Sequence, residues 1–129
     1  MLAFFDTHLL IWALLDDQER LPQGARDLLV DPSTEPLFSP ASIWEVAIKS
    51  SLGRVDFTLD PHLMRKHLLD SGYGEMPIDG AHTAAVAGLP PIHNDPFDRL
   101  LVAQATHEGI LLVTHDETVS RYPGPVRLV

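Results

Sequence analysis

Short apolar runs alternate with longer segments of mixed character along the chain. Five runs each predict a short strand: LAFF at 2–5, PLFS at 36–39, GEMPI at 74–78, ILLV at 110–113 and VRLV at 126–129. Strands without a polar face are typical of a parallel sheet that helices cover on both sides.

Helical segments separate the five runs. They span 7–15, 22–31, 40–53, 60–72, 79–91 and 95–108, and a turn with a short helix follows at 114–122. Pro22 suits a first helical turn, and Gly53 and Gly109 suit helix ends. The pattern predicts an α/β protein with a single domain over residues 1–129. We expect a three-layer α/β/α sandwich around a short, mostly parallel five-stranded sheet.

Four acidic residues lie where such a sheet places its functional crevice, beyond the carboxyl ends of the strands. Asp6 follows the first run, and Glu45 lies in the helix after the second. Asp98 opens the helix before the fourth run, and Asp116 follows that run. If the strands are parallel neighbours, these acids converge. Clustered carboxylates repel unless a cation binds, and oxygen ligands favour Mg²⁺ or Mn²⁺. Such a site activates water against a phosphodiester.

Each acid also has a purely structural alternative. Asp6 and Asp116 suit helix caps, and Asp98 suits the first turn of a helix that Asp95 caps. Glu45 precedes Lys49 by one helical turn, which favours an ion pair, and follows Ser42 at the spacing of a capping box. The joint pattern of acids after different strands favours the metal site over four separate caps.

Histidines and an arginine accompany these acids. His8, His93 and His115 each neighbour a candidate acid, but seven histidines in the chain make chance adjacency common. His93 and Arg99 are candidates for phosphate contact, and Arg99 can equally form a structural ion pair with Asp98. The aromatic side chains of Trp12, Trp44 and Phe97 are expected in the core.

The composition adds charge and location to this picture. Eighteen acidic and nine basic residues give a net charge of −9. Such a surface repels nucleic acid phosphates unless metal ions or arginines intervene, and it suits a basic protein partner. The absence of cysteine excludes zinc–thiolate sites and fits a reducing compartment. No signal peptide is recognisable, and the longest apolar run is far shorter than the roughly 20 residues of a membrane span. We therefore expect a cytoplasmic protein.

Four blocks of sequence resemble, in order and spacing, the PIN-domain ribonucleases, and especially the toxins of VapBC-type toxin–antitoxin pairs. The blocks are FFDTHLLIWALL, LFSPASIWEVAIKSSLGRV, PPIHNDPFDRLLVAQA and LLVTHDETVSRY. The resemblance covers nearly the whole chain. It implies that Asp6, Glu45, Asp98 and Asp116 are the catalytic and metal-binding residues.

The resemblance also implies a PIN-like fold, Mg²⁺ or Mn²⁺ as cofactor, and endonucleolytic cleavage of RNA. A homodimer and a cognate antitoxin with a basic inhibitory segment are the implied protein partners. In this reading Asp6, Asp98 and Asp116 hold a metal, while Glu45 holds a second metal or orients water. Thr7 and Thr114 are candidates to hydrogen-bond the ligands.

The chain departs from the family pattern at two positions. His8 stands where many relatives have Asn or Ser, and Val119 is apolar where some have a further acid. Both departures concern the outer edge of the site. Two alternatives remain for the function. One is a catalytically silent PIN-like binding scaffold. The other is a Mg²⁺-dependent phosphatase of the haloacid-dehalogenase type, although His8 occupies the position of its second Asp.

Overall fold

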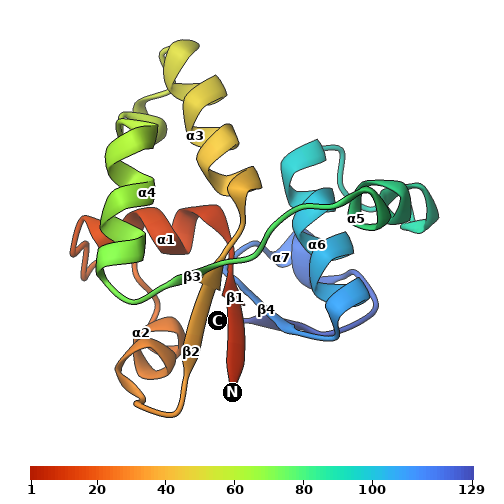
Figure 1. Ribbon diagram of the computed structural model, residues 1–129, viewed down its shortest axis with the longest axis horizontal. Coiled ribbons are helices and arrows are strands. Elements are labelled where there is room, and N and C mark those ends of the chain that lie inside the picture. The colour runs from red at the N-terminus through yellow and green to blue at the C-terminus, as the bar shows by residue number, and fades with distance from the viewer.

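A parallel five-stranded sheet lies between two layers of helices in the computed structural model, which describes residues 1–129 (Figure 1). The strands are β1 (Leu2–Phe5), β2 (Glu35–Phe38), β3 (Gly74–Glu75), β4 (Leu111–Thr114) and β5 (Val126–Leu128). Their order across the sheet is β3-β2-β1-β4-β5, and every pairing is parallel. The predicted α/β sandwich is confirmed, with a sheet that is wholly parallel.

Seven α-helices connect the strands: α1 (Thr7–Leu14), α2 (Gln23–Val30), α3 (Pro40–Ser51), α4 (Pro61–Asp70), α5 (Gly80–Ala85), α6 (Pro96–Glu108) and α7 (Glu117–Ser120). Two short 3₁₀ helices add Val55–Phe57, which the sequence pattern did not predict, and Val86–Gly88. The predicted end of α6 is confirmed, because Gly109 adopts the left-handed conformation that favours glycine (φ 66°). None of the helices is both long enough and apolar enough to cross a membrane.

Two hydrophobic cores lie on opposite faces of the sheet. Alternation along β1 sends Phe5 into one core and Phe4 into the other. The first core packs against α1, α2 and α4, and the second packs against α6 and α7 (Figure 1). Both faces of the central strands are therefore covered, which accounts for the apolar sequences of β1 and of Leu111–Val113 in β4.

Two sequence predictions about this part of the fold were wrong. Ser39 caps α3, because its hydroxyl accepts from the backbone N–H of Ala41, so Ser42 and Glu45 form no capping box. Trp44 is 57% exposed and lies outside the core. Phe97 is buried as expected.

Candidate active site

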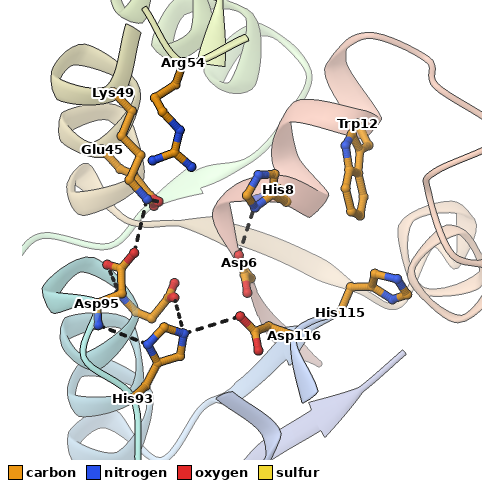
Figure 2. Close-up of a pocket in the computed structure, with 11 residues that line it drawn as sticks. Asp6, His8, Trp12, Glu45, Lys49, Arg54, His93, Asp95, His115 and Asp116 are labelled. Atoms are coloured by element: carbon orange, nitrogen blue, oxygen red, sulfur yellow. Dashed lines mark hydrogen bonds and ion pairs between the residues drawn. The ribbon is translucent and has the colours of Figure 1, made fainter. Parts of the chain in front are cut away.

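From the pair β1 and β4, the sheet continues with β2 and β3 on one side and with β5 on the other, so the strand order reverses between β1 and β4. A cavity of about 360 Å³ opens beyond the carboxyl ends of these two strands. Ligands in open parallel sheets bind at this kind of position. The cavity is lined by five carboxylates, three histidines, two cations and one tryptophan: Asp6, Glu45, Asp95, Asp98, Asp116, His8, His93, His115, Lys49, Arg54 and Trp12 (Figure 2). All four acids predicted from the sequence are among them.

Asp6 lies at the end of β1 and is almost completely buried. Its Oδ2 accepts a hydrogen bond from the Thr114 hydroxyl (2.6 Å), and its Oδ1 accepts from the backbone N–H of His8 (3.3 Å), which caps α1. Burial raises the pKa of Asp6, although the bond from Thr114 acts in the opposite direction. Asp6 therefore caps α1 as predicted, and it also accepts a hydrogen bond from Thr114, which was predicted to bond one of the acids.

Asp98 and Asp116 face a common point from different elements. Asp98 lies in the first turn of α6, and Asp116 caps α7 through the backbone N–H groups of Thr118 and Val119. The Nε2 atom of His93 lies 3.2 Å from Asp98 Oδ2 and 3.5 Å from Asp116 Oδ2. The three side chains therefore share one small space.

The hydrogen bonds of His93 decide what its ring presents to these acids. Its Nδ1 accepts from the backbone N–H of Asp95 (3.0 Å), so the proton of a neutral ring is on Nε2. An N–H group therefore points at Asp98 and Asp116, and His93 offers them no free lone pair in this arrangement.

The carboxyl group of Asp98 has no lysine or arginine as an ion-pair partner. Burial, together with the nearby carboxylates of Asp6, Asp95, Glu45 and Asp116, raises the pKa of Asp98 to about 8. The only side-chain contact of its carboxylate is with the His93 ring. A divalent cation would offset the repulsion among these carboxylates.

Glu45 is held on both sides by its neighbours. Its Oε1 accepts from the Thr7 hydroxyl (2.7 Å), and its Oε2 lies 2.5 Å from Lys49 Nζ. Lys49 also reaches Asp95 Oδ2 at 3.1 Å. Burial lowers the pKa of Lys49, but the carboxylates of Glu45 and Asp95 more than compensate and raise it overall. The predicted Glu45–Lys49 pair exists, and it lies inside the cavity.

The donor set fits a hard divalent metal ion. Asp6, Asp98 and Asp116 bring carboxylate oxygens from β1, α6 and the end of β4, and such oxygens are the ligands that Mg²⁺ and Mn²⁺ prefer. Burial raises the pKa values of Asp6 and Asp98, and the neighbouring carboxylates raise them further. The site therefore suits Mg²⁺ or Mn²⁺ better than a metal that needs nitrogen or sulfur ligands.

Several lining residues were not singled out as cavity residues from the sequence. The ring of Trp12 lies 5.5 Å from that of His8 and 5.7 Å from that of His115, so the three form one wall (Figure 2). His8 Nε2 contacts Asp56 Oδ2 at 3.2 Å. Arg54 lines the same side of the cavity. Spacing places only His8 and Trp12 together, one helical turn apart on α1, because His115 lies more than 100 residues from both.

Arg99 contacts the segment before α6, and its predicted ion pair with Asp98 is absent. Its guanidinium donates to the backbone oxygens of Pro90 and Val86 and to the Tyr122 hydroxyl, at 3.0–3.1 Å. It forms no ion pair with Asp98 and does not line the cavity. The reason is that α6 presents Arg99 to the segment before it, so this cation fixes the loop that carries His93.

A second cluster of His82, His107 and Glu108 lies at the other end of the molecule. His82 Nδ1 accepts from the Asp79 backbone N–H at 3.1 Å, so its Nε2–H donates to Glu108 Oε1 at 2.8 Å. These bonds tie α5 to α6 and leave the buried ring without a free lone pair.

Comparisons with known proteins give a consistent result. The family model described as the PIN domain matches residues 3–125. The fold is similar to VapBC2 from Rickettsia felis bound to a promoter DNA fragment, with 15% identity, a TM-score of 0.72, and coverage of 99% of this chain and 98% of that chain. It is also similar to DNA-bound VapBC from Salmonella typhimurium, with 16% identity, a TM-score of 0.66 and 98% coverage of both chains.

A toxin–antitoxin complex from Klebsiella pneumoniae is similar as well, with 17% identity, a TM-score of 0.63, and coverage of 97% of this chain and 95% of that chain. No curated protein sequence matches the chain significantly. At these identities the structural likeness concerns the fold.

Proposed function

The chain belongs to the PIN-domain family, and from that membership and the geometry of the cavity we propose that it is a metal-dependent endoribonuclease. One observation carries the proposal. Asp98 lies among four other carboxylates with only an imidazole as partner, and its pKa is raised to about 8. Such a group is poised to bind a cation rather than to stabilise the fold.

Asp6, Asp98 and Asp116 would hold the metal, and Mg²⁺ or Mn²⁺ bound there would supply Lewis acidity and a water of lowered pKa. Thr114 fixes the carboxylate of Asp6 through its hydroxyl. Glu45, held by Thr7, is placed to orient the attacking water. Attack of the water oxygen would form a new P–O bond and break the P–O bond to the leaving oxygen, so that one fragment would keep the phosphate and the other would take up a proton as a hydroxyl group.

The cations of the cavity would meet the phosphates of the substrate. Arg54 and Lys49 both line the cavity, and they are the local positive charges that a chain of net charge −9 needs to approach RNA. The Nε2–H of His93 is a further donor to a phosphate oxygen. Thr7 and Thr114 act on the substrate only through the carboxylates that they hold.

We further propose that the protein is the toxin of a VapBC-type pair, and that it forms a homodimer. The similar solved structures from Rickettsia felis and Salmonella typhimurium are VapBC complexes. Five carboxylates around one cavity favour an antitoxin segment rich in arginine or lysine as its inhibitor. This partner would be expressed with the toxin in the cytoplasm.

Cleavage of total RNA by the antitoxin-free protein tests the function. Discrete fragments are expected with Mg²⁺ or Mn²⁺, and none with EDTA or with Asp98→Asn. Asp27→Asn is the matched control, because it removes the same charge from an exposed position on α2 and should leave cleavage intact.

Two results would contradict the proposal. A folded protein that binds no metal and cleaves no RNA would favour the silent scaffold. Hydrolysis of p-nitrophenyl phosphate without any cleavage of RNA would favour the phosphatase alternative.

A further inference from the structure

Lys49 is a cation built into the interior of the acidic cavity. Its side chain is only 15% exposed, and its Nζ contacts Glu45 Oε2 at 2.5 Å and Asp95 Oδ2 at 3.1 Å. The same nitrogen lies 4.9 Å from the ring centre of Phe57 and 5.6 Å from that of Phe97. Four groups, from α3, the first 3₁₀ helix and the start of α6, therefore fix the ammonium in one place.

The carboxylate of Glu45 is already compensated by these contacts. The hydroxyl of Thr7 donates a hydrogen bond to Oε1, and the ammonium of Lys49 donates one to Oε2. The carboxylates of Asp98 and Asp116, by contrast, have the imidazole of His93 as their only side-chain partner, and Asp116 Oδ1 also accepts from the backbone N–H groups that it caps. The acids of the cavity thus divide into a compensated group around Lys49 and an uncompensated group around Asp98.

Stability alone does not account for a buried ion pair of this kind. The desolvation of two charges offsets most of their attraction, and an apolar pair of similar volume is often equally stable. An ammonium also has three N–H donors, and only two of those on Lys49 have protein acceptors. The third is available to a phosphate oxygen in the cavity.

We infer that Lys49 takes the place of a second metal ion, so that the cavity holds a single divalent cation on Asp6, Asp98 and Asp116. Sites with two metals use the second ion to neutralise substrate charge, and here the ammonium supplies that charge. Glu45 is then a positioning residue paired with Lys49 and is not a metal ligand. The inference rests on the proposed function, because it concerns the metal of that same site.

The number of bound metal ions tests this inference without reference to activity. Electron paramagnetic resonance of the full chain titrated with Mn²⁺ counts the ions and reports whether two of them are coupled. The wild type should bind one Mn²⁺ with no spin coupling. Glu45→Gln should still bind one, with an affinity within about 3-fold of the wild type, whereas loss of even a supporting group costs roughly 10-fold or more.

Lys49→Met should remove the cation that pairs with Glu45 and Asp95. A second Mn²⁺, spin-coupled to the first, should then bind. Lys49→Arg keeps the charge and should bind one ion, as the wild type does. Circular dichroism checks the fold of each variant. If Lys49→Met does not fold, the wild type and Glu45→Gln still decide the question.

Two coupled ions in the wild type, or loss of Mn²⁺ binding in Glu45→Gln, would overturn the inference. The result is separable from the proposed function. Two ions with RNA cleavage would overturn the inference alone, and one uncoupled ion without RNA cleavage would overturn the proposed function alone.

Discussion

The hydroxyl of Thr114 donates a 2.6 Å hydrogen bond to Asp6 Oδ2, and 108 residues separate the two along the chain. The bond crosses from the end of β4 to the end of β1, which are neighbours in the sheet. The same Thr114 oxygen accepts from the backbone N–H of Asp116 at 3.0 Å. One hydroxyl thus sets the position of two of the three proposed metal ligands.

Thr114→Val should therefore weaken metal binding while the fold persists. Without the hydroxyl, Asp6 loses the donor that orients it, and we expect a loss of roughly 10-fold or more in Mn²⁺ affinity. The free energy of unfolding should fall by about 1 kcal/mol. Calorimetric titration and thermal unfolding measure the two effects. Thr83→Val is the matched control, because the Thr83 hydroxyl bonds Gly80 on the exposed side of α5, and unchanged affinity in both variants would contradict the prediction.

The stability of the metal-free protein should depend on pH through Asp98. Its pKa rises from the ordinary 3.8 to about 8 in the fold, chiefly because of burial. The folded state therefore favours the protonated form, and ionisation costs stability as pH rises from about 4 through about 8. Asp98→Asn removes this cost, so we expect its melting temperature at pH 8.5 to exceed that of the wild type by about 4 °C or more.

The difference between the two proteins should vanish below about pH 3, where the carboxyl is protonated in both the folded and the unfolded chain. Saturating Mg²⁺ at pH 8.5 should raise the melting temperature of the wild type and leave Asp98→Asn nearly unchanged. A wild type that is more stable than Asp98→Asn in EDTA at pH 8.5 would show that Asp98 supports the fold.

Arg99 should matter for stability and not for phosphate binding. Its guanidinium holds Pro90, Val86 and Tyr122, so Arg99→Ala should lower the free energy of unfolding by about 2 kcal/mol. Arg99→Lys should not restore it, because an ammonium cannot reproduce the planar set of donors. Urea unfolding measures both variants. A phosphate contact would instead leave stability unchanged and reduce the salt dependence of RNA binding.

A synthetic peptide rich in arginine should bind the cavity and inhibit cleavage. Five carboxylates there face only two cations, so binding should weaken by roughly 10-fold between low and physiological salt. Fluorescence anisotropy with a labelled peptide measures the affinity. Asp98→Asn should reduce the affinity more than Asp27→Asn does, and equal losses would indicate attraction by net charge alone.

The sequence predicted the layers and the four acids because both follow from local pattern. Short runs without a polar face require cover on both sides, and the carboxyl ends of parallel strands meet at one edge. These rules bring Asp6, Glu45 and Asp116 together without knowledge of any distance. The caps at Asp6, Asp95 and Asp116 could also be predicted, because each precedes a helix.

Other features depended on contacts between distant segments. A helix as apolar as α3 does not reveal which of its faces is buried, and so Trp44 was expected in the core. Lys49 has the spacing of a surface ion pair, and only the approach of Phe57 and Phe97 places it inside the cavity. The direction of Arg99 depends on how the preceding loop returns to α6.

The pairing of β1 with β4 has a consequence for the protein during its synthesis on the ribosome. Asp116 leaves the ribosome more than a hundred residues after Asp6. Folding of the sheet must wait for this long-range pairing. A nascent chain that has not reached Asp116 therefore lacks one of the three proposed metal ligands. Under the proposed function, such a chain would be unable to cut the message from which it is being translated.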